Sequence, residues 1–206
     1  MNNPNVIFEI LEASYVSGAR GVEVVPAGKI LEAARMMIER YDDYVILGST
    51  YPGENPMIDA LINVGAKLIF VHGMISDNRG ATLLKIIEEI SSSGVIPGIA
   101  THNPIPTIKF CIKNSLNVKF FLIPFNSQGF LMGNKEELEQ LVDNAKDFYF
   151  IGMKTLAAGI INPGIAFEYI IKHNICALTI GMINNHQAAE STAIALKALN
   201  KKVKTE

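Results

Sequence analysis

Short apolar segments alternate with longer amphipathic segments along almost the whole chain. The clearest example lies between residues 147 and 191, where Phe148–Met153 and Ile175–Met182 are apolar runs and Pro163–Lys172 is a helical segment with proline in its first turn. Two consecutive parallel strands need a crossover of this kind, and nearly all such crossovers are right-handed. The pattern therefore predicts a strand, a loop, a helix and a second strand.

The same unit recurs from the N-terminus onwards. A helix is expected first, with Asn3 as its candidate cap, Pro4 in its first turn and Gly18 at its end. Seven strands follow at intervals of roughly 23 to 30 residues, each followed by a helix. The expected strands are Gly21–Val25, Tyr44–Gly48, Lys67–His72, Val95–Thr101, Val118–Pro124, Phe148–Met153 and Ile175–Met182. The expected later helices are Ile30–Arg40, Asn55–Asn63, Ala81–Ser93, Ile105–Asn114, Lys135–Ala145, Pro163–Lys172 and Gln187–Leu199.

The even spacing of these units favours an eight-stranded α/β barrel over a doubly wound open sheet. Such a barrel typically uses about 250 residues and can be built from roughly 200 when its loops are short. A doubly wound sheet would place phosphate-binding glycines after the first strand, and GVEVVPAGK matches such a loop only weakly. We therefore predict one domain spanning residues 1–206, a TIM (β/α)8-type barrel with seven evident strands and a first strand that is missing or truncated.

The missing first strand leaves three alternatives. Residues 1–5 supply a short strand, the barrel is open between its first and last strands, or the gene product has lost an N-terminal piece. An open sheet edge needs covering, because its unpaired backbone groups can pair with another chain. We therefore expect a homo-oligomer contact or a partner at this seam.

Composition narrows the class of protein. Hydrophobic residues make up 49% of the 206 residues and charged residues 18%, so the chain can bury a sizeable core. The net charge is −2 and basic residues cluster only at the end of the chain, so we expect no nucleic-acid partner. No apolar run approaches the roughly 18 residues of a membrane span, and nothing resembles a signal peptide. Cys111 and Cys176 lie in apolar segments and are expected to be buried thiols, which favours a cytoplasmic location without membrane contact.

Ionisable residues end several of the apolar strands. The segments LIFVHG, GIATHN and FIGMK place His72, His102 and Lys154 at strand ends. The carboxyl ends of barrel strands gather at one rim, where the chemistry of such proteins takes place. We expect these residues to share a site with Glu23 of GVEVV. In a catalytic site, His72 would be the acid or base, Glu23 would orient it, and Lys154 would hold an anion or attack a carbonyl group.

Each of these residues also has a purely structural interpretation. His72 could be a core histidine bonded to a backbone carbonyl, and Glu23 could face outwards to a lysine on a covering helix. His102 and Asn103 could cap the next helix. Lys154 could be a rim lysine with an exposed ammonium group. A metal site made from Glu23, His72 and His102 is chemically conceivable, but no local ligand spacing supports it, so we predict no metal.

The ordered series of strand and loop motifs resembles the aldo/keto reductase superfamily. The series is GVEVVPAG, DDYVILGST, LIFVHG, IPGIATHNP, FFLIPFNSQG, GMKTLAAG and LTIGMINNHQ. It resembles the signatures of that superfamily from its second strand to its eighth and covers nearly the whole chain. The resemblance implies an eight-stranded barrel that binds NADPH at the C-terminal rim and reduces carbonyl compounds with an Asp, Tyr, Lys and His tetrad.

Only half of that tetrad is present. Glu23 falls where the superfamily has its Asp, and His72 ends the strand where it has its His. Gly28 stands at the position of the Tyr and Ser49 at that of the Lys. A tyrosine acid needs a neighbouring ammonium group to lower its pKa, so the standard NADPH-dependent reduction is not expected. Tyr51, two residues beyond the strand end, is a candidate replacement for the acid.

The resemblance also assigns the cofactor-binding positions. Met182 and Ile183 stand where the superfamily has a Lys-Ser pair that holds the extra phosphate of NADPH, and no arginine follows. The phosphate would therefore lack its strong hydrogen-bond donors. Backbone N–H groups of the LAAG loop and of the last helix could still hold an anion. The candidate cofactor-binding residues are His102, Asn103, Phe125, Asn126, Gly159 and Asn184.

Several functions remain open at this point. The sequence favours an aldo/keto-reductase-like barrel that binds a small anionic or carbonyl ligand at its C-terminal rim. One alternative is an oxidoreductase that uses NADP in a non-standard site, and another is a lyase, isomerase or hydrolase. A non-catalytic binding protein or an oligomeric scaffold is a further alternative. The fold alone does not decide between them.

Overall fold

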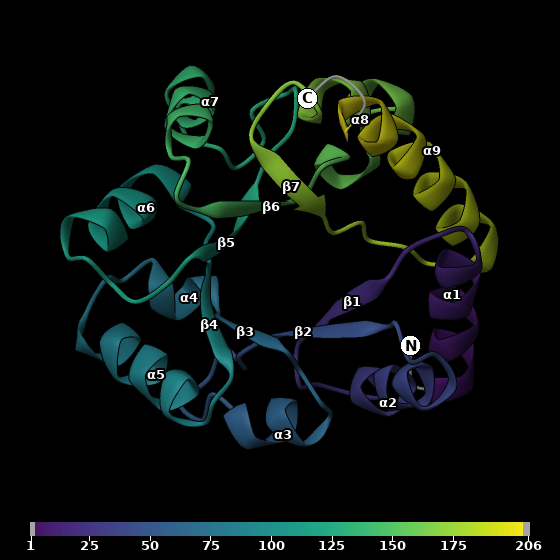
Figure 1. The fold of residues 1–206 in the computed structure, drawn as a ribbon, viewed down its shortest axis with the longest axis horizontal. Coiled ribbons are helices and arrows are strands. Elements are labelled where there is room, and N and C mark those ends of the chain that lie inside the picture. The colour runs from purple at the N-terminus through teal and green to yellow at the C-terminus, as the bar shows by residue number, and fades with distance from the viewer. Residues whose placement is uncertain (1–2, 204–206) are drawn as a thin grey trace.

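The computed structural model describes residues 3–203, in which seven parallel strands curl into an incomplete barrel with helices around its outside (Figure 1). The strand order follows the sequence, and each strand pairs in parallel with the next. This confirms the predicted α/β barrel-type fold. The strands are β1 Gly21–Val24, β2 Val45–Ser49, β3 Leu68–Val71, β4 Ile96–Ala100, β5 Phe120–Pro124, β6 Tyr149–Met153 and β7 Ile175–Leu178.

The helices also follow the predicted order, with differences at their ends. The α-helices are α1 Pro4–Val16, α2 Ile30–Arg40, α3 Ile58–Asn63, α4 Gly73–Ser76, α5 Ala81–Ser92, α6 Pro104–Lys113, α7 Lys135–Asn144, α8 Pro163–Ile170 and α9 Asn185–Val203. A short 3-10 helix, η1, spans Ala157–Gly159. Asn3 caps α1 as expected, because its side chain accepts a hydrogen bond from Asn5 N at 3.0 Å. The short helix α4 was not predicted, since a single turn has no legible helical period.

The main hydrophobic core lies between the strands and the surrounding helices, and we call it the outer layer. Strand side chains alternate between two faces, and Ile69, Phe121 and Phe150 are buried on the face that meets the helices. Phe167 of α8 is fully buried in the same cluster. Burial of apolar surface contributes about 25 cal/mol per Å², so these large side chains stabilise the fold strongly.

The opposite strand faces line the interior of the barrel and form a separate, smaller cluster. It consists of Leu68, Phe70, Ala100, Leu122 and Ile151, which we call the interior cluster. Gly98 of β4 makes room for it, because a Cβ at that position would lie 2.6 Å from Cδ1 of Phe70. The interior is therefore a packed core in its middle, as in closed barrels.

The barrel is open between β1 and β7, and this opening is the seam. Within the described residues the two edge strands do not pair with each other, and α1 and α9 pack together across the outside of the opening (Figure 1). Oγ of Ser14 and Oγ1 of Thr192 lie 2.8 Å apart in this buried contact. Gly18, at φ +110°, allows the chain to pass close to Leu196, since a Cβ there would lie 2.3 Å from Leu196 Cδ1. The open-barrel alternative thus holds for the described chain.

Two other predictions concern the seam, namely a first strand from residues 1–5 and a homo-oligomer contact. Pro4 and Asn5 belong to α1, so they do not supply a first strand, and residues 1 and 2 lie outside the described part. The homo-oligomer contact at the seam stays a prediction. Among residues 3–203, no helix combines the length and the apolar character needed to cross a membrane.

The two cysteines differ in burial. Cys111 is buried in α6, as expected, whereas Cys176 of β7 is exposed, so the prediction that it is buried was wrong. The reason is that β7 is an edge strand whose register with β6 shifts between Phe150 and Ile151. This irregularity turns the side chain of Cys176 outwards, although its Sγ still contacts Phe150 O at 3.3 Å.

Candidate functional site

Three of the predicted site residues come together at the C-terminal rim of the barrel. His72 follows β3 directly, His102 lies two residues beyond β4, and Lys154 follows β6 directly. The ring centroids of His72 and His102 are 5.9 Å apart, with an interplanar angle of 79°. Lys154 is close enough for its positive charge to lower the pKa of His102. We call His72, His102 and Lys154 the rim cluster.

His72 is held by hydrogen bonds to its backbone and to its ring. Its backbone N donates to Oγ1 of Thr50 at 3.0 Å, and its Nδ1 accepts from Met74 N at 3.2 Å. Because Nδ1 is an acceptor, neutral His72 carries its proton on Nε2. Burial lowers the pKa of His72, the nearby His102 lowers it further, and the charge of Asp77 opposes both effects. His72 is therefore a neutral hydrogen-bond donor at neutral pH.

His102 lies against the first turn of α4. A Cβ on Gly73 would lie 2.9 Å from Cδ2 of His102, so this close approach requires glycine there. Burial and the charge of Lys154 lower the pKa of His102, and the charge of Asp77 opposes them. The ring is thus neutral at neutral pH and can accept a proton.

Lys154 has an unusual backbone conformation. Its φ is +53°, in the left-handed region that residues with a side chain adopt at a cost. Its carbonyl oxygen accepts hydrogen bonds from Ala157 N at 2.9 Å and from Nδ2 of Asn126 at 3.3 Å, which stabilise this conformation. Within the described residues its ammonium group forms no ion pair. An unpaired cation beside His102 is a suitable binding group for an anion.

The side chain of Glu23 faces the interior of the barrel. Val22 and Val24 pack on the outer layer, so the side chain between them faces the interior, not a lysine on a covering helix. Burial raises the pKa of Glu23, and the nearby Ser49 hydroxyl offsets part of the rise. In the described residues no hydrogen bond or ion pair joins Glu23 to His72, so the expected orientation of His72 by Glu23 is not formed.

Two buried hydroxyl groups of this region have no hydrogen-bond partner among the described residues. They are Oγ of Ser49, at the end of β2, and Oγ1 of Thr155, next to Lys154. Ser49 lies near Glu23 but outside hydrogen-bonding geometry. Buried polar groups are nearly always paired with protein or water, so these two hydroxyls are available to water or to a ligand.

Phe125 and Asn126 are engaged away from the rim cluster. The Phe125 ring is fully buried in the outer layer, with ring centroids 5.7 Å from Tyr169 and 5.2 Å from His173. The Asn126 amide holds its own loop, because Nδ2 donates to Phe130 O at 3.0 Å and Oδ1 accepts from Phe130 N at 2.9 Å. Both residues are fully buried.

The remaining cofactor candidates lie on exposed loops. Asn103 stands at the start of α6 without a side-chain capping bond. Asn184 caps α9, since its Oδ1 accepts from Gln187 N at 2.9 Å. Gly159 is exposed, with φ +87° and open space where a side chain would be, and Tyr51 is also exposed on the rim. Of the residues that the resemblance assigned to NADPH, His102 is the one that lies in the rim cluster.

Sequence reasoning missed Asp77, the residue that follows α4. Its Oδ1 accepts from the hydroxyl groups of Thr101 and Thr107, the latter at 3.0 Å, and its Oδ2 accepts from His102 N at 2.9 Å. In sequence Asp77 stands in a polar stretch that is typical of a loop. The only available signal was a carboxylate five residues after a histidine that ends a strand.

Two further histidines lie outside the rim cluster. His186, whose side chain is 89% exposed, is a surface residue. His173 is half-buried, with Nδ1 2.9 Å from Oδ2 of Asp143. Phe125 and Tyr169 pack against its ring. Among residues 3–203, no three His, Cys, Asp or Glu side chains are grouped so that they could hold a metal ion.

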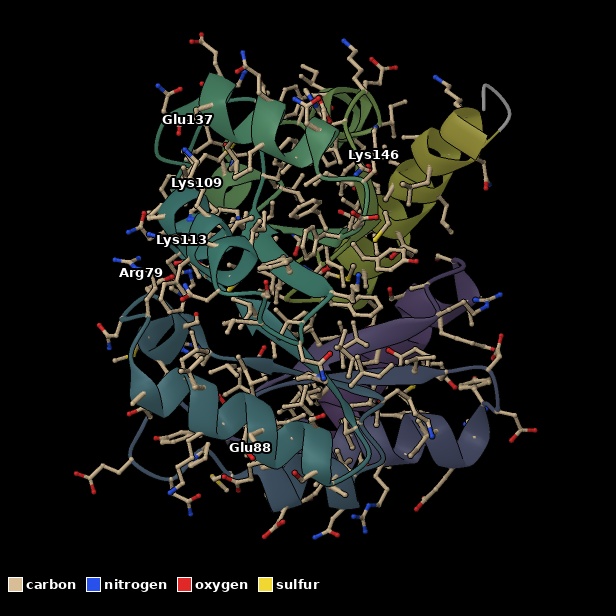
Figure 2. The ribbon with its side chains drawn as sticks, turned by 60° about the vertical axis from the view of Figure 1, so that its left-hand side comes forward. Arg79, Glu88, Lys109, Lys113, Glu137 and Lys146 are labelled. Atoms are coloured by element: carbon tan, nitrogen blue, oxygen red, sulfur yellow. The ribbon has the colours of Figure 1, made fainter. Side chains whose placement is uncertain are left out.

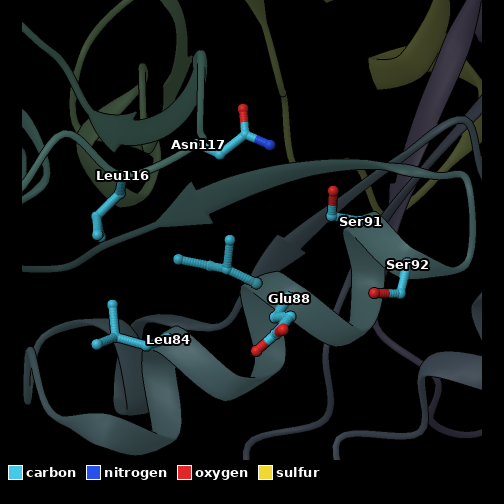
Figure 3. Close-up of a pocket in the computed structure, with 7 residues that line it drawn as sticks. Leu84, Glu88, Ser91, Ser92, Leu116 and Asn117 are labelled. Atoms are coloured by element: carbon cyan, nitrogen blue, oxygen red, sulfur yellow. The ribbon is translucent and has the colours of Figure 1, made fainter.

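A surface pocket lies between α5 and the segment that leads into β5 (Figure 3). Its volume is about 260 Å³, and its lining includes Leu84, Glu88, Ser91 and Asn117. Glu88 is its one ionisable lining residue. None of the rim cluster lines this pocket, so we do not assign the candidate site to it.

No protein-family model matches the chain, and no curated protein sequence matches it. Solved structures match its fold. The aldo-keto reductase AKR11C1 from Bacillus halodurans is 12% identical, with a TM-score of 0.66, over 97% of this chain and 86% of that one. An aldo/keto reductase from Brucella melitensis is 10% identical, with a TM-score of 0.63, over 98% and 89%. The 2-keto-3-deoxy-6-phosphogluconate aldolase of Zymomonas mobilis ZM4 is 17% identical, with a TM-score of 0.62, over 95% and 87%.

These likenesses show that the chain has the barrel fold of the aldo/keto reductases, as the motifs implied, and that an aldolase shares it. At such low identity they show the fold alone.

Proposed function

We propose that the rim cluster binds a small anionic carbonyl compound and removes a proton from the carbon beside the carbonyl group. The observation that carries this proposal is the convergence of an unpaired lysine and two neutral histidines from the ends of three different strands. Functional groups of barrels gather at this rim.

Each member of the rim cluster has a distinct role in this proposal. The Lys154 ammonium group pairs with the anionic group of the ligand. Nε2–H of His72 donates a hydrogen bond to the carbonyl oxygen, and a neutral ring nitrogen of His102 accepts the proton. The C–H bond breaks, an N–H bond forms on His102, and the electron pair moves towards the carbonyl oxygen. This chemistry is that of a lyase or an isomerase.

The similar structures support an anionic ligand. The aldolase from Zymomonas mobilis is named for a phosphorylated keto acid, and its structure holds 3-phosphoglycerate. A point mutant of Gox0644, which is 11% identical to this chain with a TM-score of 0.66, is described in complex with NADPH. Both ligands carry phosphate groups, and the reductases and the aldolase are named for carbonyl chemistry. Proton transfer is favoured over hydride transfer because the cofactor candidates Phe125, Asn126 and Asn184 are engaged elsewhere.

Calorimetric titration of 3-phosphoglycerate, pyruvate and NADPH into the protein and its Lys154→Met variant tests the proposal. Loss of a charge-assisted hydrogen bond should weaken binding of an anionic carbonyl compound about tenfold or more. Lys146→Met, which removes another lysine from the loop before β6, is the matched control and should bind as the unmodified protein does. Equal affinities of the two variants, or binding of NADPH alone, would overturn the proposal.

A further inference from the structure

We infer that Asp77 is a positioning residue that holds His102 in place beside His72. This inference rests on the proposed function of the rim cluster, because it assigns the residue that orients its base. Asp77 lies in the loop after α4, whereas His102 lies in the loop after β4. The carboxylate of Asp77 therefore joins two neighbouring rim loops. Asp77 and His102 are 25 residues apart in sequence, which is about the length of one strand-helix repeat.

The carboxylate fixes the backbone of the second loop at several points. Oδ2 of Asp77 accepts from His102 N at 2.9 Å, and Oδ1 accepts from the Thr101 hydroxyl group. Oγ1 of Thr101 in turn accepts from Asn103 N at 3.0 Å. The residues on both sides of His102 are thus tied directly or indirectly to one carboxylate, which orients the backbone from which the imidazole projects.

The first residues of α6 support the carboxylate from its other side. Oγ1 of Thr107 donates to Oδ1 of Asp77 at 3.0 Å and accepts from Nη1 of Arg79 at 3.4 Å. Arg79 lies on the same side of the molecule as Lys109 and Lys113 of α6 (Figure 2). Three hydrogen bonds to one carboxylate hold it in a fixed orientation.

Packing restricts His102 as well. The imidazole lies against Gly73, where a side chain would come within 2.9 Å of its Cδ2. The Ser76 hydroxyl group donates to Ala100 O, so α4 is also fixed to the end of β4. The helix that precedes Asp77 is therefore attached to the strand that precedes His102, and the two cannot shift independently.

The charge of Asp77 has a second effect on the histidines. The ionisable groups that face His102 are Asp77 from the loop after α4, His72 from the end of β3 and Lys154 from the end of β6. Asp77 is the one carboxylate among these groups, and it raises the pKa values of both histidines against burial. Without it, His102 would face only groups that disfavour its protonated form, so it would release and accept protons at lower pH.

Asp77→Asn in the ligand-free protein tests this role, with histidine titrations followed by NMR. The titration midpoint of His102 should fall, because the one carboxylate whose charge raises the pKa of His102 is lost. The His102 amide hydrogen should exchange about tenfold faster, since a neutral amide oxygen is a weaker acceptor than the carboxylate it replaces. Asp59→Asn, which neutralises an exposed carboxylate of α3, is the matched control and should change neither quantity.

A folded Asp77→Asn variant with an unchanged His102 midpoint and unchanged amide exchange would overturn the inference. Should that variant not fold, Thr107→Val removes one donor to Asp77 while keeping its charge, and unchanged exchange of the His102 amide in that variant would overturn it equally. The test of Asp77 can fail or succeed independently of the test of the proposed function. Failure of the unmodified protein to bind 3-phosphoglycerate or pyruvate rejects the proposed function, whereas the ligand-free titrations test Asp77 alone.

Discussion

The outer layer and the interior of the barrel are built from the same strands but differ in what their residues do. In the outer layer, large apolar side chains such as Phe121, Phe150 and Phe167 are fully buried between strands and helices. The interior has only a small apolar cluster in its middle, and Glu23 and Ser49 occupy its side near the seam. The contrast teaches that stability resides mainly in the outer layer, while the interior and the rim carry groups that reduce stability and are suited to function.

Substitution of a large side chain in the outer layer should have the largest effect on stability. Phe167→Ala removes a fully buried ring and leaves a cavity, so it should lower the free energy of unfolding by about 3–5 kcal/mol. Chemical denaturation measures the change. Phe130→Ala, which removes a phenylalanine that is 40% exposed, is the control and should cost about 1 kcal/mol or less. If both variants lost the same free energy of unfolding, the outer layer would contribute no more to stability than the surface does.

A substitution that overfills the interior cluster should have a smaller effect. Gly98→Ala places a Cβ within 2.6 Å of the Phe70 ring, so it should lower the free energy of unfolding by about 1–3 kcal/mol. Gly181→Ala introduces the same methyl group where nothing lies within 4 Å, and it should change stability by about 0.5 kcal/mol or less. Indistinguishable midpoints in urea for the two variants would mean that the interior is not packed at Phe70.

Neutralising Glu23 should change the free energy of unfolding least, and it should raise it, whereas the two substitutions above should lower it. Burial raises the pKa of Glu23 in the folded protein above its ordinary value, so its ionisation opposes folding. This cost is absent below the ordinary pKa, develops as the pH rises through the raised pKa, and is complete above it. Glu23→Gln should therefore raise stability by roughly 1 kcal/mol at neutral pH, and its advantage should disappear in acid.

Thermal unfolding of Glu23→Gln at several pH values measures that difference. Glu54→Gln, at an exposed position between β2 and α3, is the matched control and should show no such pH dependence. A Glu23→Gln variant that is less stable than the unmodified protein at neutral pH would show that the carboxylate is paired and stabilising. The interior of the barrel would then not reduce stability at this position.

The sequence predicted the order of the strands well because each of them is a short, continuous apolar run. It also predicted that His72 and Lys154 end strands, since an ionisable residue directly after such a run is visible in one dimension. Parallel strands then bring these ends to one rim, and the structure shows His102 beside both His72 and Lys154.

The sequence did not predict features that depend on contacts between distant segments. Asp77 accepts hydrogen bonds from Thr101 and Thr107, and no local pattern distinguishes such an acceptor from an ordinary loop carboxylate. Phe125 was expected beside a ligand, but strand alternation places its ring in the outer layer beside Tyr169. Cys176 was expected to be buried, and a register shift in an edge strand cannot be seen in the sequence.

The most direct test of the account uses the four histidines of the chain as reporters during one NMR titration with 3-phosphoglycerate or pyruvate. His72 and His102 lie in the rim cluster, whereas His173 packs against Tyr169 and His186 is exposed on α9. The account predicts that the signals of His72 and His102 shift together along one saturation curve while those of His173 and His186 stay unchanged. Equal shifts of all four signals, or a shift of His173 or His186 alone, would contradict it.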